Sequence, residues 1–252
     1  MEAMLKLTLK AFRAPEEPEL CQEFVRQHRK VLEDFGISNV TTNNEHWLDD
    51  PNAIIIVALN EEFGMMGGIR LQLATEGRVL PMEEAIAKLD PQVKQALEEL
   101  RPHGNGEVCS LWNANEFRHL GIPILLSQAV TAISVQVGAG RMVCLVAHYT
   151  KKHPSRNGFV VMEQLGDQGT FAYPVPGITA IAMVNPNTSL LEHATPDHRQ
   201  VLYSLRLRPE QVRVETPLST PMEVHYRMRL ESGLFDLQAY RDIEADRLRF
   251  IA

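Results

Sequence analysis

The 252-residue sequence lacks any apolar run that approaches the roughly 18 residues needed to cross a lipid bilayer. Its first residues, MEAMLKLTLKAF, also lack the apolar stretch and the small-residue cleavage site of a secretory signal. Cysteine is scarce: Cys21, Cys109 and Cys144 are odd in number and widely spaced within apolar patterns. We therefore expect a cytoplasmic protein without a membrane span, whose thiols are reduced and buried.

The sequence also lacks an excess of positive charge. Its 25 Lys and Arg residues are outnumbered by 32 Asp and Glu residues, which gives a net charge of -7. Nucleic acids and anionic membranes bind basic surfaces, so this balance argues against both as general partners. The histidines are scattered, and His148 and His153, for example, form no ligand spacing with a carboxylate or a cysteine. We therefore predict no metal site.

The overall composition, with 44% apolar and 23% charged residues, is typical of a folded globular protein. No internal repeat, low-complexity linker or shift in composition marks a domain boundary. We therefore expect a single domain over residues 1–252, with a C-terminal extension from about residue 185.

Apolar periodicity predicts a chain of alternating helices and strands. Glycines stop several helices, Asp90 and Pro91 divide the segment 82–101 into two helices, and strict alternation of apolar and polar residues marks a strand at 221–230. The predicted elements are a helix at 16–35, strands at 53–59 and 65–74, two helices within 82–101, a strand at 106–114, a helix at 122–137, a strand at 141–149, a short turn or helix at 151–157, strands at about 158–164 and 177–184, a helix from Thr195 and Pro196, a strand at 221–230 and an amphipathic helix at about 234–251.

The stretch EFRHLGIP at 116–123 lies between a predicted strand and a predicted helix. Such a junction presents unpaired backbone N–H groups at the positive end of the helix dipole, where phosphate groups bind. Gly121 would let an anion approach the main chain, Arg118 and His119 would add charged hydrogen bonds, and Pro123 is tolerated in a first helical turn. The alternative is that these residues are only a well-formed helix start.

The order of the elements resembles the GNAT superfamily of acyl-CoA N-acyltransferases over about residues 50–165. In that family the turn after the fourth strand reads Gln or Arg, two residues, Gly, one residue, then Gly or Ala. The corresponding residues here are Arg118, His119, Leu120, Gly121, Ile122 and Pro123. The resemblance implies an α+β fold of mixed α/β character: a central mixed, mostly antiparallel, twisted sheet flanked by helices on both faces, with extra helices at 82–101 and at the C-terminus.

A second similarity narrows the resemblance to N-acyl amino acid synthases and autoinducer (acyl-homoserine lactone) synthases. Those proteins carry a G-x-x-R-L pattern in the third strand, matched by Gly67 to Leu71, and a glutamate that opens the fourth strand, matched by Glu107. The implied activity moves an acyl group from acyl-CoA, or from the acyl-phosphopantetheine of an acyl carrier protein, to an amine or amino acid.

The resemblance also implies a mechanism in which the fourth and fifth strands part and the acyl-pantetheine lies between them. Backbone N–H groups near Leu111 and Trp112 would hold the oxyanion, and Glu107 would accept the proton of the amine. Arg70 would bind the carboxylate of an amino acid acceptor. Each residue has a structural alternative: Glu107 as a strand-end glutamate, Arg70 as a sheet-surface arginine and Trp112 as a core residue.

Two positions depart from the pattern of the family. Pro154 stands where a tyrosine usually protonates the leaving thiol, and Tyr149, His148 and His153 are the substitutes nearby in the sequence. Pro123 removes one backbone donor that would hold a coenzyme A pyrophosphate. Fewer donors suffice for the single phosphodiester of a carrier protein, so a carrier protein is compatible as a partner.

A cluster of basic residues is expected near the two helix starts, where it would attract an acidic carrier or a nucleotide phosphate. The alternative is that its lysines lie in a solvated loop. The residues are Arg118, His119, Arg141, Lys151, Lys152 and Arg156.

Two other functions stay open. A catalytically degenerate protein of the same fold would bind or sense an acyl thioester, which the absent tyrosine favours. An acyl-homoserine lactone synthase would use S-adenosylmethionine, but Ser110 stands where those enzymes usually place an arginine. The sequence leaves undecided the acyl chain length, the acceptor, the choice between coenzyme A and a carrier protein, and whether the chain forms a homodimer.

Overall fold

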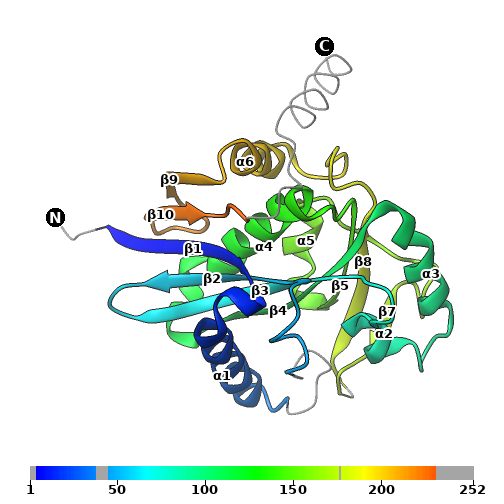
Figure 1. Ribbon diagram of the computed structural model, residues 1–252. Coiled ribbons are helices and arrows are strands. Elements are labelled where there is room, and N and C mark those ends of the chain that lie inside the picture. The colour runs from blue at the N-terminus through cyan, green and yellow to red at the C-terminus, as the bar shows by residue number, and fades with distance from the viewer. Residues whose placement is uncertain (1–3, 38–44, 176, 231–252) are drawn as a thin grey trace.

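The computed structural model describes residues 4–37, 45–175 and 177–230, which form one ten-stranded sheet with helices on both faces (Figure 1). The strands are β1 (Leu5–Arg13), β2 (Ala53–Asn60), β3 (Gly64–Leu73), β4 (Asn105–Asn113), β5 (Arg141–Ala147), β6 (Val160–Val161), β7 (Thr170–Ala172), β8 (Thr179–Asn185), β9 (Glu210–Glu215) and β10 (Met222–Arg227). Their order is β6-β8-β5-β4-β3-β2-β1-β10-β9, with β7 also paired to β8. The pairs β1–β10 and β4–β5 are parallel and the others are antiparallel. The predicted fold class is confirmed.

The helices lie on the two faces of this sheet. They are α1 (Pro18–Asp34), α2 (Pro81–Ile86), α3 (Gln92–Leu100), α4 (Ile122–Ile133), α5 (Lys152–Arg156) and α6 (Pro196–Leu207). The 3-10 helices η4 (Asn115–Leu120) and η5 (Ser134–Val137) precede and follow α4. Helices α4 and α6 cover one face, whereas α1 lies on the other, with α2 and α3 farther along the sheet (Figure 1). No helix of the described residues is long and apolar enough to cross a membrane.

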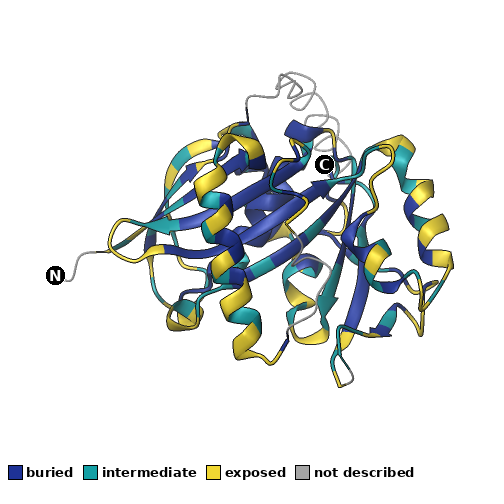
Figure 2. Cartoon of the chain, turned by 60° about the horizontal axis from the view of Figure 1, so that its bottom comes forward, coloured by how far each residue is buried: buried dark blue, intermediate teal, exposed yellow. Residues whose placement is uncertain are grey.

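The central strands are apolar throughout because both of their faces are covered. Along β2, Ile54 and Ile56 pack on the α4 side, whereas Ile55 and Val57 pack on the α1 side. Helix α1 turns its buried residues to the sheet and its charged residues outward (Figure 2). A separate group of buried side chains joins α2 and α3 to β5 and β8. The run AIIIVAL therefore reads as a strand that is buried on both sides.

Most predicted elements are confirmed, including the hairpin β2–β3 and the division of segment 82–101 into α2 and α3. At that division, Asp90 Oδ1 accepts a hydrogen bond of 2.9 Å from the Gln92 N–H. The strand predicted at 158–164 was wrong in length, because only Val160–Val161 is extended. Strands β1, β7 and β9 were not predicted. The helix predicted at 234–251 lies outside the described residues.

The segment after residue 185 builds part of the central sheet. It contributes α6, β9 and β10, and β10 pairs in parallel with β1, from Leu5 opposite Met222 to Lys10 opposite Arg227. The first and last strands of the described residues thus become neighbours, and no local pattern could have predicted that pairing.

Strands β4 and β5 are paired over only part of their length. The parallel ladder runs from Asn105 opposite Arg141 to Val108 opposite Cys144 and stops there. Beyond it, β4 stays paired to β3 and β5 stays paired to β8. The expected parting of these two strands is confirmed.

Gly68 on β3 is required by packing against α1. A Cβ at this position would lie 2.5 Å from Phe24 Cε2 and 3.1 Å from Trp112 Nε1. Phe24 has little room to move, because its ring packs edge-on against Trp47 and Trp112 at centroid distances of 5.7 and 5.8 Å. The absent side chain therefore allows α1 to approach the sheet.

We predict that Gly68→Ala lowers the free energy of unfolding by about 1–3 kcal/mol, because the added methyl group overpacks this contact. Urea denaturation measures the change. In a Phe24→Leu background the same substitution should cost less, because the ring atoms it meets are absent. An equal cost in both backgrounds would contradict the packing argument.

Candidate active site

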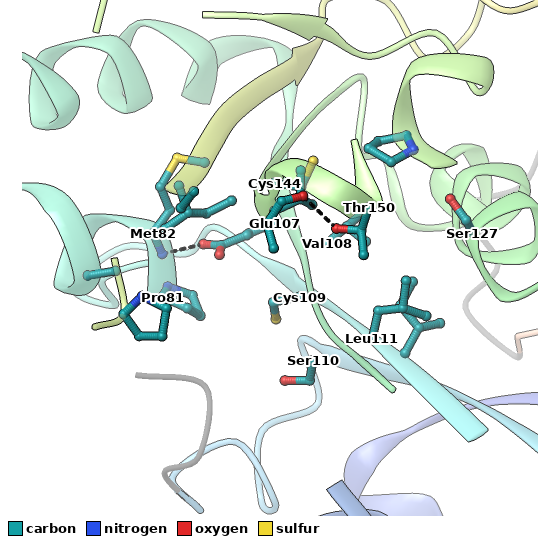
Figure 3. Close-up of a pocket in the computed structure, with 18 of the residues that line it drawn as sticks. Pro81, Met82, Glu107, Val108, Cys109, Ser110, Leu111, Ser127, Cys144 and Thr150 are labelled. Carbon is teal, nitrogen blue, oxygen red and sulfur yellow. Dashed lines mark hydrogen bonds between the residues drawn. The ribbon is translucent and has the colours of Figure 1, made fainter. Parts of the chain in front are cut away.

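A cavity of about 250 Å³ opens where β4 and β5 part. Its walls come from α1, α2, β4, α4 and β5, and from the segment between Tyr149 and Ala180. Because α1 and α2 lie on one face of the sheet and α4 on the other, the cavity passes through the sheet. Glu107 reaches toward Pro81 and Met82 at one end, whereas Leu111 and Ser127 lie at the other (Figure 3). One reaction site could thus be approached from both faces.

Glu107 is the acidic group of this cavity and is only 2% exposed. Its Oε2 accepts a hydrogen bond of 2.7 Å from the backbone N–H of Met82, in the first turn of α2. Burial raises the pKa of this carboxyl to about 8, against the opposing effects of the Met82 N–H and of Arg70. The side chain is therefore mostly protonated at neutral pH, and it can exchange a proton near pH 8.

Arg70 lies one layer behind the cavity wall and is 1% exposed. Its Nε donates a hydrogen bond of 3.2 Å to Cys109 Sγ, and its guanidinium stacks over Trp47 at 4.9 Å from the ring centroid. No ion pair joins Arg70 to a carboxylate among the described residues. Its charge still acts on the site, because it lowers the pKa of Glu107 and contributes to lowering that of His28.

A β-bulge in β4 shapes the middle of the cavity. Arg70 is opposite Cys109 and Gly68 is opposite Trp112, so Ser110 and Leu111 together face a single residue of β3. Ser110 takes a φ of 51°, which is unusual for a residue other than glycine. Its buried hydroxyl has no hydrogen-bond partner of good geometry among the described residues. The bulge therefore holds a strained, polar residue at the cavity wall.

The side chains of Leu111 and Trp112, whose backbone N–H groups are the proposed oxyanion donors, lie in different surroundings. Leu111 lines the cavity, whereas the side chain of Trp112 packs with Phe24 in the core on the α1 side. The core role of the Trp112 side chain is thereby confirmed. Its backbone belongs to the bulged part of β4, next to Leu111.

The stretch Arg118 to Pro123 forms the end of η4 and the start of α4, outside the cavity lining of the described residues. Gly121 has a φ of 75° and caps α4, and Pro123 lies in the first turn, as expected. The side of Gly121 that a Cβ would occupy is filled by Pro217 and Leu218. Arg118 and His119 are exposed. An anion would therefore meet this turn from the side of these two basic residues.

The three expected substitutes for the missing tyrosine lie in different surroundings. Tyr149 lines the mouth of the cavity and is 57% exposed. His148 is exposed, and neither it nor His153 is among the lining residues. Burial and the nearby Lys152, together with Arg156 and His198, lower the pKa of His153 to about 4. His153 is thus neutral at physiological pH.

The expected basic cluster is divided. Arg141 begins β5 opposite Asn105, at the other end of that strand from Lys151 and Lys152. Its inclusion in the cluster was wrong, because a seven-residue strand separates it from the lysines. Among the described residues, no group of three His, Cys, Asp or Glu residues could hold a metal ion.

No protein-family model and no curated protein matches the chain by sequence. By structure it is similar to FeeM, an N-acyl amino acid synthase from uncultured soil microbes, with a TM-score of 0.57 and 16% identity over 77% of this chain and 96% of that one. The chain has a GNAT-like fold.

Two further solved structures are similar to this GNAT-like chain. BjaI, a CoA-dependent acyl-homoserine lactone synthase, has a TM-score of 0.49 and 15% identity over 96% of this chain and 99% of its own. An acyl-CoA N-acyltransferase from Pseudomonas aeruginosa has a TM-score of 0.48 and 14% identity over 71% and 98%.

We predict that burial of Glu107 in this GNAT-like fold makes stability depend on pH. The folded state holds the proton up to about pH 8, whereas the unfolded chain releases it near pH 4.5. Stability should therefore fall as pH rises through this window, by on the order of 4 kcal/mol. Urea unfolding of the wild type and of Glu107→Gln at pH 5 and pH 8.5 measures the difference.

Glu107→Gln should lack this loss. The exposed Glu99, on α3, provides the control, because Glu99→Gln should keep it. Identical pH dependence in the wild type and Glu107→Gln would mean that the buried carboxyl has an ordinary pKa.

Proposed function

We propose that the chain is an N-acyltransferase that moves an acyl group from an acyl thioester, either acyl-CoA or an acyl carrier protein, to an amine. The observation that carries the proposal is the cavity through the sheet, with a buried, proton-exchanging carboxyl at one end and an apolar compartment at the other. The GNAT-like fold supports it, because FeeM, which has this fold, is an N-acyl amino acid synthase.

In this mechanism the neutral amine approaches from the α1–α2 side, and its nitrogen attacks the thioester carbon. Ionised Glu107 accepts one proton from that nitrogen as the carbon–nitrogen bond forms, and backbone N–H groups at the Leu111 and Trp112 bulge hold the negative oxygen. The intermediate then collapses with loss of the thiolate. Glu107 is ionised in half of the molecules near pH 8, so it can act as a base in mildly alkaline solution.

The acceptor class that fits best is an amino acid. Arg70 is a buried cation without a carboxylate ion pair among the described residues, and a buried, unpaired charge is costly. An acceptor carboxylate at this end of the cavity would compensate that charge. Because Arg70 lies behind Cys109, this role requires its guanidinium to act across the cavity wall or to turn toward the cavity.

In the proposed complex the phosphate of the donor binds at the start of α4. Arg118 and His119 are exposed there and could pair with it, and residues Leu120 to Pro123 form the turn itself. Pro123 lacks an N–H, which favours the single phosphodiester of a carrier protein over the pyrophosphate of coenzyme A. Tyr149 and His153 remain candidates for the proton donor to sulfur.

A binding or sensing protein is the alternative that an observation favours. Pro154 lines the cavity in the place where the family's tyrosine is expected. Such a protein would hold the thioester without turnover. An acyl-homoserine lactone synthase is disfavoured, because Ser110 stands in place of the arginine expected in that class.

The two leading functions differ in the release of thiol. We expect free thiol to appear when the protein is mixed with acetyl or palmitoyl thioesters and a panel of amines and amino acids, and only when amine is present. A thiol-reactive dye measures release and differential scanning fluorimetry measures binding. Thermal stabilisation by the thioester without any release would instead support the binding protein.

The assigned base makes a separate prediction. Glu107→Gln should lower kcat by at least about 100-fold, because the amine loses its proton acceptor, while the affinity for the donor stays within about twofold. The wild-type kcat/KM should rise with pH to a plateau above about pH 8, and the variant should lack this rise. Glu99→Gln is the matched control. Unchanged turnover in Glu107→Gln would exclude Glu107 as the base.

A further inference from the structure

Ser127 on α4 contributes a hydroxyl to the α4 side of the cavity (Figure 3). Its Oγ accepts a hydrogen bond of 2.8 Å from Asn157 Nδ2. Asn157 is fully buried, and its Oδ1 lies 2.7 Å from His198 Nδ1. Since the amide nitrogen faces Ser127 and the amide oxygen faces His198, the imidazole donates its Nδ1–H to the amide. The direction of both hydrogen bonds is thereby set.

This arrangement leaves the proton of Ser127 available to the cavity. Serine and threonine in a helix commonly donate to the carbonyl one turn earlier. Thr131 and Ser134 donate in this way, Thr131 to the Ser127 carbonyl at 2.8 Å and Ser134 to the Thr131 carbonyl. None of the hydrogen bonds among the described residues uses the Ser127 proton. An oxygen that already accepts a hydrogen bond is also a stronger donor.

Ser127 lines the same cavity as Ser110 and Leu111, the two residues of the β4 bulge. This part of β4 has already parted from β5. A thioester whose oxygen is held at the bulge would place its sulfur within reach of this helix.

We infer that Ser127 is the catalytic hydrogen-bond donor to the leaving sulfur, with Asn157 and His198 as positioning residues; this rests on the proposed acyl transfer. When the carbon–sulfur bond breaks, its electron pair goes to sulfur and the Ser127 O–H stabilises the thiolate. Serine keeps its proton, and the thiolate is protonated by water on release. Glu107 returns the amine proton to solvent, so the cycle balances. A hydroxyl on α4 thus replaces the side chain that Pro154 lacks.

The sharpest test varies the leaving group. A donor pair consists of N-acetylcysteamine and 4-nitrothiophenol thioesters that carry the acyl group turned over by the wild type. Ser127→Ala should lower kcat/KM about 10- to 100-fold with the first donor, because an alkyl thiolate needs stabilisation. With the second, the loss should stay below about threefold, since a thiol of low pKa leaves readily.

Two variants separate this role from packing. Asn157→Asp replaces the amide donor with a carboxylate that turns the Ser127 proton toward itself, so it should show the same dependence on the leaving group. Thr131→Val removes a neighbouring hydroxyl whose proton is already donated to the Ser127 carbonyl. It should change kcat/KM with both donors by one common factor. Equal losses with both donors in Ser127→Ala, or no loss with either, would overturn the inference.

A binding measurement tests the same contact without turnover. Ultraviolet absorbance reports ionisation of the thiol of bound coenzyme A as pH is raised. Ser127→Ala should raise the pKa of that thiol by about one unit, because a hydrogen bond to the thiolate is lost. An unchanged pKa would overturn the role of Ser127 and leave the acyl transfer standing, whereas absence of amine-dependent thiol release by the wild type would overturn the acyl transfer on which that role rests.

Discussion

The constraint on which the site depends is the early end of the β4–β5 ladder. Four residues of each strand pair, and each strand then follows its other neighbour, β3 or β8. Where two strands part inside a covered sheet, backbone groups lose their partners and space opens between two packed faces. The bulge at Ser110 lies at this point, so β4 bends where the pairing ends. The cavity is a direct consequence of that interrupted pairing.

Two buried ionisable groups, Arg70 and Glu107, lie at the cavity and do not neutralise each other. Arg70 carries a permanent charge behind Cys109, whereas burial keeps Glu107 protonated up to about pH 8. A carboxyl that ionised fully next to this arginine would form a buried ion pair with no need of a substrate. Glu107 instead accepts a hydrogen bond from the Met82 N–H, Arg70 donates one to Cys109 Sγ, and no ion pair joins the two residues.

The opposite side of the cavity has a different chemistry. There α4 and β5 supply mainly apolar walls, and the hydroxyl of Ser127 is held among them by its hydrogen bond from Asn157. The network Ser127, Asn157 and His198 joins α4, the end of α5 and α6, three elements that meet only in the folded chain. A site with a proton acceptor on one face and a hydrogen-bond donor on the other is suited to a reaction in which one group is deprotonated while another leaves with a negative charge.

The sequence by itself determined most of the local elements, because the periodicity of apolar residues, the glycine stops and the Asp90–Pro91 break act over a few neighbours. Its resemblance to the GNAT superfamily implied the class of the fold. The same resemblance singled out Glu107, because a glutamate that opens the fourth strand can be matched in the sequence alone. Only the tertiary structure decided which groups share the cavity: it placed Trp112 in the core, Arg70 behind the wall, Arg141 at the wrong end of β5, and Ser127 beside Asn157. The physical reason is that burial, hydrogen-bond direction and strand parting arise from contacts between segments far apart in the chain, which no local pattern encodes.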